Sequence, residues 1–345
     1  MQQYCETIPN VTPKNMPLNG AGLKFLNLEK SLIICADDFA LNDGVSEAIV
    51  RLAGQGRISA TSVLSLSPLW PEHARKLKDQ ASRVDVGLHL DLTSEFAVKA
   101  GYGAPLNQVL LKALRRGYYG LEMDEIIKSQ LEKFESIWGA PPDHIDGHQH
   151  IHQFPGIRES LLRVLQAYFP GAYIQPQAPS KDRPWVRVAQ VRPLGFKASI
   201  ISLTGAQGLE GLLKRGDVNF TPYLLGVYEF NLNQVRYRQH FKNWLISSSQ
   251  IEGVRVKNLS DISDKSEISH MPHILQRSHL SDRSRLGNMP PSIMCHPATF
   301  SELGDPIGAA RCVEFAYLSS QEFSNDLTAA DLTLVAGSEF IRNNV

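Results

Sequence analysis

The chain has 345 residues, of which 43% are hydrophobic, and its 35 basic residues balance its 35 acidic ones. This length suffices for one large α/β domain or two smaller ones, and the zero net charge gives no reason to expect nucleic acid or an anionic membrane surface as a partner. No apolar run approaches the roughly 20 residues that cross a bilayer, and the first residues lack the pattern of a signal peptide, so we expect no membrane span.

Short apolar runs alternate with helical patterns along the chain. Strands are predicted at 31–36, 61–66, 84–90, 172–175, 185–188, 224–230, 292–297 and 332–335. Helices are predicted at 45–53, 71–77, 124–138, 157–168, 237–246 and 309–325, the first capped by Asn42 or Asp43. This alternation indicates an α/β domain with a mostly parallel sheet, either open or closed into a barrel.

Three stretches lack such patterns. Residues 1–29 are rich in Pro and Asn and are expected to form a loosely attached N-terminal arm, which leaves 30–345 as the domain. Residues 94–122 are expected to be irregular and to face a substrate. Residues 255–290 are rich in charge and hydroxyl groups, which predicts a mobile insertion.

The four cysteines are Cys5, Cys35, Cys295 and Cys312, and they form neither a CxxC pair nor a disulfide framework. Cys35 and Cys295 lie in apolar runs and are predicted to be buried on strands. We therefore expect a reduced, cytoplasmic protein.

Four histidines and one aspartate occupy alternate positions between 144 and 152. They are His144, Asp146, His148, His150 and His152. On a strand these side chains would share one face. A solvated histidine-rich loop or a chance cluster is the alternative, but we favour metal or acid–base chemistry, because neutral imidazole is a common metal ligand.

Other Asp and His residues also follow predicted strands. Asp37 and Asp38 follow the first strand, His89 ends the third, and His296 follows Met294-Cys295 in the strand at 292–297. Because the carboxyl ends of parallel strands converge, we expect these side chains to meet. Adjacent carboxylates need a cation or a proton between them, unless one is merely a helix cap and the other a solvated acid.

Each of these residues also has a plainer interpretation. His89 alone would more often be a hydrogen-bonded core residue, and His296 alone is a weak signal. On a strand the side chains of Asp37 and Asp38 should point to opposite faces, so one could bind metal while the other acts as a base. Arg187 is a candidate to orient Asp37, with a surface ion pair as the alternative.

Taken together, four motifs resemble those of the YdjC-like carbohydrate deacetylases, a family that includes chitooligosaccharide deacetylases and HpnK-type hopanoid-associated proteins. The motifs are Ala36-Asp-Asp-Phe-Ala, Gly87-Leu-His-Leu-Asp-Leu-Thr, His144-Ile-Asp-Gly-His-Gln-His-Ile-His and Met294-Cys-His-Pro-Ala. The resemblance covers residues from about 32 to 326, apart from the stretch 255–290.

The resemblance implies a distorted (β/α) barrel and removal of an acetyl group from an N-acetylated sugar. It implies one divalent metal ion, Mg²⁺ or Zn²⁺, held by Asp38, His89 and His148, with Asp37 as the base and His296 as the acid. It leaves the roles of His150 and His152 open. The family pattern usually has Gly where this chain has Ala40, which costs roughly 1 kcal/mol if the position requires a positive φ.

The leading hypothesis is therefore a metal-dependent carbohydrate N-deacetylase, whose partner is a small N-acetylated sugar and whose assembly could be a homodimer. A metal-dependent phosphoesterase is one alternative, because Asp146, His150 and His152 could supply ligands for a second ion. A sugar-binding protein without catalysis is another. Trp185 and Tyr228 could stack on a sugar ring, although core packing is the plainer expectation for both.

Overall fold

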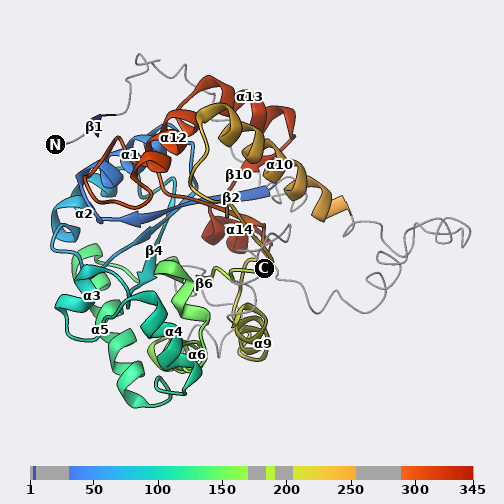
Figure 1. The fold of residues 1–345 in the computed structure, drawn as a ribbon. Coiled ribbons are helices and arrows are strands. Elements are labelled where there is room, and N and C mark those ends of the chain that lie inside the picture. Colours follow the sequence, from blue (N-terminus) through green and yellow to red (C-terminus); the bar gives the residue numbers. More distant parts are fainter. Residues whose placement is uncertain (1–2, 5–30, 170–183, 191–204, 254–288, 345) are drawn as a thin grey trace, which may run out of the picture.

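The computed structural model describes residues 3–4, 31–169, 184–190, 205–253 and 289–344 (Figure 1). The predicted strand at 172–175 lies outside the described residues. So do the predicted arm, apart from Gln3 and Tyr4, and the predicted insertion at 255–290, apart from residues 289–290.

A parallel sheet curled into a half-barrel forms the centre of the fold (Figure 1). Its strands are β2 (Ser31–Phe39), β3 (Ala60–Val63), β4 (Asp85–Leu90), β5 (His144–Gly147), β6 (Trp185–Val186), β7 (Leu224–Leu225) and β8 (Ser292–Cys295). They run in the order β6-β5-β4-β3-β2-β8-β7, and every neighbouring pair is parallel. A short strand, β10 (Thr333–Leu334), also pairs in parallel with β2. The prediction of a distorted (β/α) barrel with a mostly parallel sheet is confirmed.

Backbone hydrogen bonds between β6 and the residues just before β7 partly close the sheet. The backbone N–H of Val186 donates to the carbonyl of Asn219 at 2.9 Å, and that of Thr221 donates to the carbonyl of Val186 at 3.1 Å. Away from this sheet, β1 (Gln3–Tyr4) pairs antiparallel with β9 (Phe300–Ser301).

Helices connect the strands. They are α1 (Asp43–Gly54), α2 (Trp70–Lys78), α3 (Glu95–Lys99), α4 (Leu106–Leu114), α5 (Leu121–Trp138), α6 (Ile157–Tyr168), α9 (Gln207–Arg215), α10 (Gln234–Gly253), α12 (Gly308–Leu318), α13 (Gln321–Ala329) and α14 (Gly337–Asn344). Asn42 caps α1 by accepting from the N–H of Val45 at 2.9 Å, one of the two caps predicted. Helices α9 and α14 were not predicted from the sequence.

Helices α3 and α4 correct the prediction that residues 94–122 are irregular. The Ser94 hydroxyl caps α3 by accepting from the N–H of Phe96 at 3.0 Å. Val109 and Ala113 of α4 are fully buried in the core. Only one narrow stripe of this short helix faces the core, so its periodicity is too weak to recognise without the neighbouring elements.

Strand β2 is buried on both faces, which explains its continuous apolar sequence. Leu32 and Ile34 belong to the large core between the sheet and the helices. Ile33 packs inside the half-barrel with Trp185 and with Phe340 of α14. Helix α14 therefore helps to fill the amino-terminal end of the half-barrel and leaves its carboxyl-terminal end to the polar residues.

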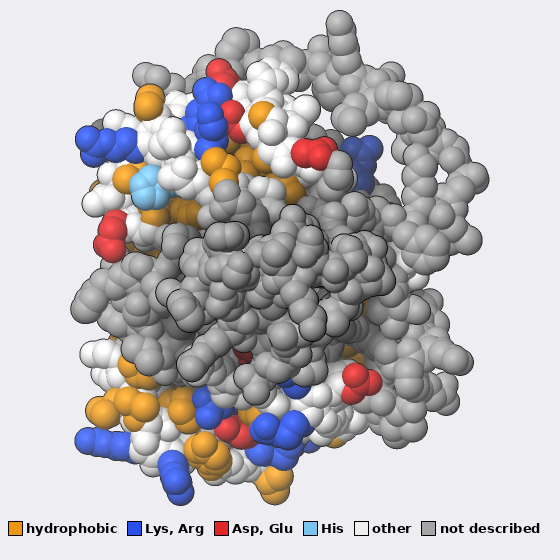
Figure 2. All heavy atoms as spheres, turned by 90° about the vertical axis from the view of Figure 1, so that its right-hand side faces the viewer, with side chains coloured by type: hydrophobic (Ala, Val, Ile, Leu, Met, Phe, Trp, Pro, Cys, Tyr) orange, Lys and Arg blue, Asp and Glu red, His pale blue; other side chains and the backbone are white. Residues whose placement is uncertain are grey.

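Among the described helices, none is long and apolar enough to cross a membrane. On the face in Figure 2, the described Lys and Arg side chains are interspersed with Asp and Glu. Cys35 and Cys295 are free and buried, as predicted. Cys312, in contrast, is disulfide-bonded, so the expectation that all cysteines are reduced is wrong for this residue.

Candidate active site

Strand β2 extends past the predicted end and includes both Asp37 and Asp38. Simple alternation would turn Asp38 toward the helices, together with Ile34 and Ala36. Instead Asp38 has a φ of 69°, and the register with β3 shifts between Ala36 and Phe39. Both carboxylates therefore reach the same site, and the prediction that they point to opposite faces is wrong.

The backbone returns to the left-handed region two residues after Asp38. Ala40 has a φ of 71°, so the position where the family usually has Gly does require a positive φ. Its backbone is held on both sides: its N–H donates to the Ser46 hydroxyl at 3.0 Å, and its carbonyl accepts from the Ser67 hydroxyl at 2.6 Å. These bonds help to keep Ala in a conformation that costs it roughly 1 kcal/mol.

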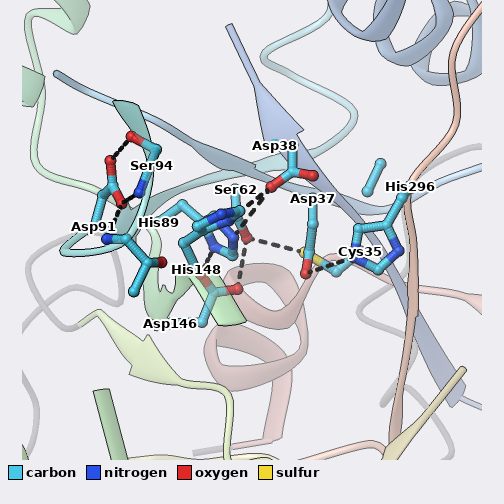
Figure 3. A network of polar contacts seen from close by, with 12 residues as sticks. Cys35, Asp37, Asp38, Ser62, His89, Asp91, Ser94, Asp146, His148 and His296 are labelled. Carbon is cyan, nitrogen blue, oxygen red and sulfur yellow. Dashed lines mark hydrogen bonds and ion pairs between the residues drawn. The ribbon is translucent and has the colours of Figure 1, made fainter. Parts of the chain in front are cut away.

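Three side chains from the ends of β2, β4 and β5 converge (Figure 3). Asp38 Oδ1 lies 3.1 Å from His148 Nδ1 and 3.5 Å from His89 Nε2. One ligand atom from each residue lies within 4.8 Å of the others, which is close enough for one cation to contact all three. These are the three residues that the resemblance assigned to the metal.

A hydrogen bond to Asp146 defines how His89 faces this group. His89 Nδ1 donates to Asp146 Oδ1 at 2.5 Å, so Nε2 is the ring nitrogen that faces Asp38. Burial alone would lower the pKa of His89, but Asp146 and Asp38 raise it to about 10. The site thus attracts positive charge strongly, and the donor set of one carboxylate and two imidazoles fits a divalent cation.

Asp37 is held by a buried guanidinium. Arg187 donates through Nη1 to Asp37 Oδ1 at 2.7 Å and through Nη2 to Asp37 Oδ2 at 2.6 Å. Nη2 also lies 2.8 Å from Asp146 Oδ2. Because the side chain of Arg187 is only 1% exposed, the alternative of a surface ion pair is wrong. Arg187 orients Asp37 and links it to the carboxylate that holds His89.

His296 lies on the other side of Asp37 (Figure 3). Its Nε2 is 3.9 Å from Asp37 Oδ2, and its ring meets the ring of Phe230 edge-on at 5.4 Å. Its backbone N–H donates to Glu314 Oε2 at 2.5 Å. Burial lowers the pKa of His296 to about 4, although the nearby carboxylates oppose the shift. The imidazole is therefore neutral near pH 7.

A fully buried polar layer lies beneath these residues. The Ser62 hydroxyl donates to Asp146 Oδ2 at 2.6 Å and lies 3.0 Å from His144 Nε2. Cys35, His144 and Asp146 also offer donor atoms close enough for a cation. However, Arg187 already supplies the positive charge at Asp146, and burial raises the pKa of the Cys35 thiol, which disfavours the thiolate that would bind metal. We interpret this layer as a support for Asp146.

His150 and His152 do not join the group of Asp38, His89 and His148. After His148 the chain enters a 3₁₀ turn (η2, His148–Gln153) in which Gln149 and His150 have φ values of 53° and 61°. The alternation predicted for 144–152 therefore stops at Gly147. His152 Nε2 donates to the carbonyl of Arg187 at 2.8 Å, and burial lowers its pKa to about 4, so it anchors Arg187 as a neutral imidazole.

The two aromatic residues considered for sugar stacking are core residues. Trp185 is fully buried, stacks on His144 with ring centroids 4.4 Å apart, and donates to Asp85 at 2.9 Å. The Tyr228 hydroxyl donates to Glu314 Oε1 at 2.7 Å. The plainer expectation is confirmed for both.

Two residues of α12 at the site were missed by the sequence analysis. Arg311 Nη2 donates to Asp38 Oδ2 at 2.7 Å, and Glu314 accepts from His296 as described above. Both side chains are buried. The available signal was an Arg and a Glu three residues apart in an otherwise apolar helix, which places two charges on one helix face.

Comparison with known proteins gives relatives for this arrangement. Two curated relatives are named chitooligosaccharide deacetylase: one from Yersinia enterocolitica serotype O:8 / biotype 1B is 32% identical over 145 residues, and one from Yersinia pestis (strain Pestoides F) is 34% identical over 144 residues. Each match covers 38% of this chain and 53% of the relative, so the chain spans about half the length of the curated relatives it matches.

A crystal structure from Enterococcus faecalis V583, described as that of a cellobiose-phosphate cleavage protein, is similar with a TM-score of 0.55. The match covers 90% of this chain and 98% of that one, but at 20% identity it indicates a shared fold alone. The sequence model of the family described as YdjC-like protein matches residues 31–329, which include all the residues that converge at the site. The chain therefore belongs to the YdjC-like family.

Proposed function

We propose that the protein is a metal-dependent carbohydrate deacetylase, which hydrolyses the acetamide of an N-acetylated sugar or oligosaccharide. The observation that carries this proposal is the convergence of Asp38, His89 and His148 beside a second carboxylate, Asp37, and a further imidazole, His296. The family and the names of the curated relatives support the same activity.

Asp38, His89 and His148 would hold one divalent ion. When bound, such an ion polarises the acetyl carbonyl and makes water more acidic. Two imidazole nitrogens and one carboxylate oxygen suit Zn²⁺ better than Mg²⁺, which prefers oxygen ligands, so we expect Zn²⁺ to bind more tightly.

Asp37 is suited to accept the proton of the attacking water. Arg187 holds both of its oxygens, so the carboxylate is fixed in one orientation. An orientation fixed in advance is what efficient proton transfer requires.

His296 is suited to deliver a proton to the departing amine, which would be a very poor leaving group as an anion. A pKa of about 4 means that His296 does not store this proton before the reaction. Its Nε2 is 3.9 Å from Asp37 Oδ2, so a small shift would let it receive the proton that Asp37 has taken from water. In this scheme the proton moves from Asp37 to His296 and then to the amine.

The alternatives find less support in the arrangement of these residues. A phosphoesterase with two metals needs further ligands, but Asp146 is engaged by His89, Ser62 and Arg187, and His152 by the backbone of Arg187. A protein that only binds sugar needs no base paired with a proton donor.

The test is acetate release from N-acetylated mono- and oligosaccharides, measured with Zn²⁺ and with Mg²⁺, together with the metal content after dialysis. We expect acetate release with one ion per chain, and loss of most of that metal in His148→Ala. Two tightly bound ions per chain would favour the phosphoesterase. Full metal occupancy in His148→Ala would contradict the proposed ligand set.

A further inference from the structure

Helix α12 contacts the site at two points that the proposed reaction does not explain. Arg311 and Glu314 are three residues apart, so their side chains leave the same face of the helix. Arg311 meets Asp38 and Glu314 meets His296, so each residue touches a different functional group. Only 4% of Arg311 and 1% of Glu314 is exposed, and neither residue belongs to the group that converges on the cation site.

Arg311 occupies one of the two oxygens of Asp38 and leaves the other to the two histidines. Oδ1 faces His148 and His89, whereas Oδ2 accepts from Arg311 Nη2 at 2.7 Å. Asp305 fixes the guanidinium from the other side by accepting from Arg311 Nε at 2.8 Å. Asp38 is thereby left with one oxygen for a cation, and part of its negative charge is already neutralised.

Glu314 fixes the backbone of His296 and no atom of its ring. Its Oε2 accepts from the His296 N–H at 2.5 Å, and its Oε1 is held by the Tyr228 hydroxyl at 2.7 Å. Pro297 follows directly and restricts the backbone of His296 to extended conformations. The Nδ1 atom of His296 has no hydrogen-bond partner among the described residues, so apart from its contacts with Phe230 and Asp37 the ring depends on its backbone for its direction.

We propose that α12 is a positioning element for the site: Arg311 restricts Asp38 to a one-oxygen ligand and weakens its charge, and Glu314 aims His296 at Asp37. This inference rests on the proposed function, because it assigns Asp38 to the metal and His296 to proton transfer. Mutation of groups that orient metal ligands typically costs roughly 10- to 100-fold in metal affinity or activity. We expect an effect of that size here, with the sign of the change in affinity set by the charge that is removed from Asp38.

Removing each of the two contacts should have a different effect on cation affinity and on turnover. Removing Arg311 removes a positive charge from Asp38 and frees its second oxygen, so the cation should bind more tightly while turnover falls. A purely structural arginine would give the reverse, because a displaced Asp38 would bind the cation more weakly. Removing Glu314 should leave the cation affinity unchanged and impair the delivery of the proton to the amine.

The first experiment titrates Co²⁺ into metal-free protein and records its visible absorption, which reports the number of ligands. In Arg311→Met we expect binding about 10-fold tighter or more, a spectrum shifted toward higher coordination, and a lower kcat for acetate release. Arg163→Met is the matched control. Arg163 lies away from the site and pairs with Asp124 at a distance of 2.7 Å, so this variant should behave like the wild type. Unchanged or weaker Co²⁺ binding in Arg311→Met would overturn the role of Arg311.

The second experiment compares an N-acetyl sugar with an activated acetate ester, whose leaving group needs no proton. In Glu314→Gln we expect kcat to fall at least 10-fold more for the amide than for the ester, with Co²⁺ affinity unchanged. Tyr228→Phe keeps the carboxylate and should show the same pattern more weakly. Tyr168→Phe, which breaks a similar bond to Glu135, is the control. Equal losses for both substrates would reject the role of Glu314.

Failure of this inference differs from failure of the proposed function. If wild-type protein binds Co²⁺ through His148 but releases no acetate from any sugar, the proposed activity fails while the Arg311 titration remains a valid test. If the Co²⁺ titration of His148→Ala matches that of the wild type, the ligand set itself is wrong, and the inference for Arg311 falls with it.

Discussion

Asp37 and Asp38 are neighbours in the sequence, but they have different partners in the structure. Asp37 is paired with Arg187, whereas Asp38 lies among His89, His148 and Arg311. The Arg311 guanidinium and the hydrogen bonds from the two histidines outweigh burial and hold the pKa of Asp38 well below its usual range. One dipeptide thus supplies both the proposed metal ligand, Asp38, and the proposed base, Asp37.

Replacing either aspartate should separate these two roles. Asp37→Asn cannot accept a proton at neutral pH, so it should retain metal and lose activity by about 10²- to 10⁴-fold. Asp38→Asn should lose most of the metal. The measurements are metal content after dialysis and kcat for acetate release. If Asp37→Asn loses metal while Asp38→Asn keeps it, the two assignments are reversed.

His296 gives a second prediction for a single residue. Since its pKa is about 4, wild-type activity should show no alkaline limb that belongs to this imidazole between pH 6 and 9. His296→Ala should lower kcat for the amide more than for an activated acetate ester, with metal content unchanged. Equal losses for both substrates, accompanied by a lower free energy of unfolding, would indicate a structural histidine.

At the scale of the elements, the site depends on how closely β4 and β5 approach each other. A Cβ atom added to Gly87 would lie 2.4 Å from three ring atoms of His144, so the ring occupies the space that a side chain would need. His144 contacts Ser62, which contacts Asp146, which in turn contacts His89. Gly87 therefore supports the position of His89, the proposed metal ligand only two residues away.

We expect Gly87→Ala to destabilise the protein by roughly 1–3 kcal/mol, because overpacking forces the His144 ring to move. Urea unfolding measures the change, and metal content should fall with it. The control is Gly54→Ala at the end of α1, where the nearest atom to the added Cβ is 3.6 Å away. That change should be neutral or slightly stabilising. Equal stability of the two variants would show that the sheet adapts to the extra methyl group.

At the scale of the whole molecule, the site carries ionisable groups that folding removes from water. Glu314 is the clearest case outside the cation site. Burial raises its pKa to about 7 from an ordinary value of 4.5, although the His296 N–H and the Tyr228 hydroxyl partly oppose the shift. Above its ordinary pKa, an unfolded chain loses this proton while the folded chain still keeps it.

The stability of the protein should therefore fall as pH rises from about 4.5 to 7 and level off above that window. Relative to Glu314→Gln, which does not titrate, wild-type protein should lose on the order of 3 kcal/mol across the window. Chemical denaturation of both proteins at pH 5 and pH 8 measures this difference. A difference that stays constant with pH would mean that Glu314 is ionised in the folded state throughout.

The sequence by itself determined the parallel α/β architecture and five of the residues that meet at the site. Buried strands leave a continuous apolar pattern, and a charged or imidazole side chain directly after such a pattern is costly unless the fold uses it. Asp37, Asp38, His89, His148 and His296 could therefore be identified from local patterns, because strand ends converge in any parallel sheet. The short helices α3 and α4 could not, because their apolar stripe is narrow.

Only the tertiary structure decided how these residues are held and charged. The positive φ of Asp38 depends on a register shift between β2 and β3, and the turn after His148 ends the alternation that the sequence suggested. Arg187, Arg311 and Glu314 are 150, 273 and 18 residues away from the site residues that they contact. Such contacts leave no local periodicity, because packing alone brings these side chains together and sets the dielectric that shifts their pKa values.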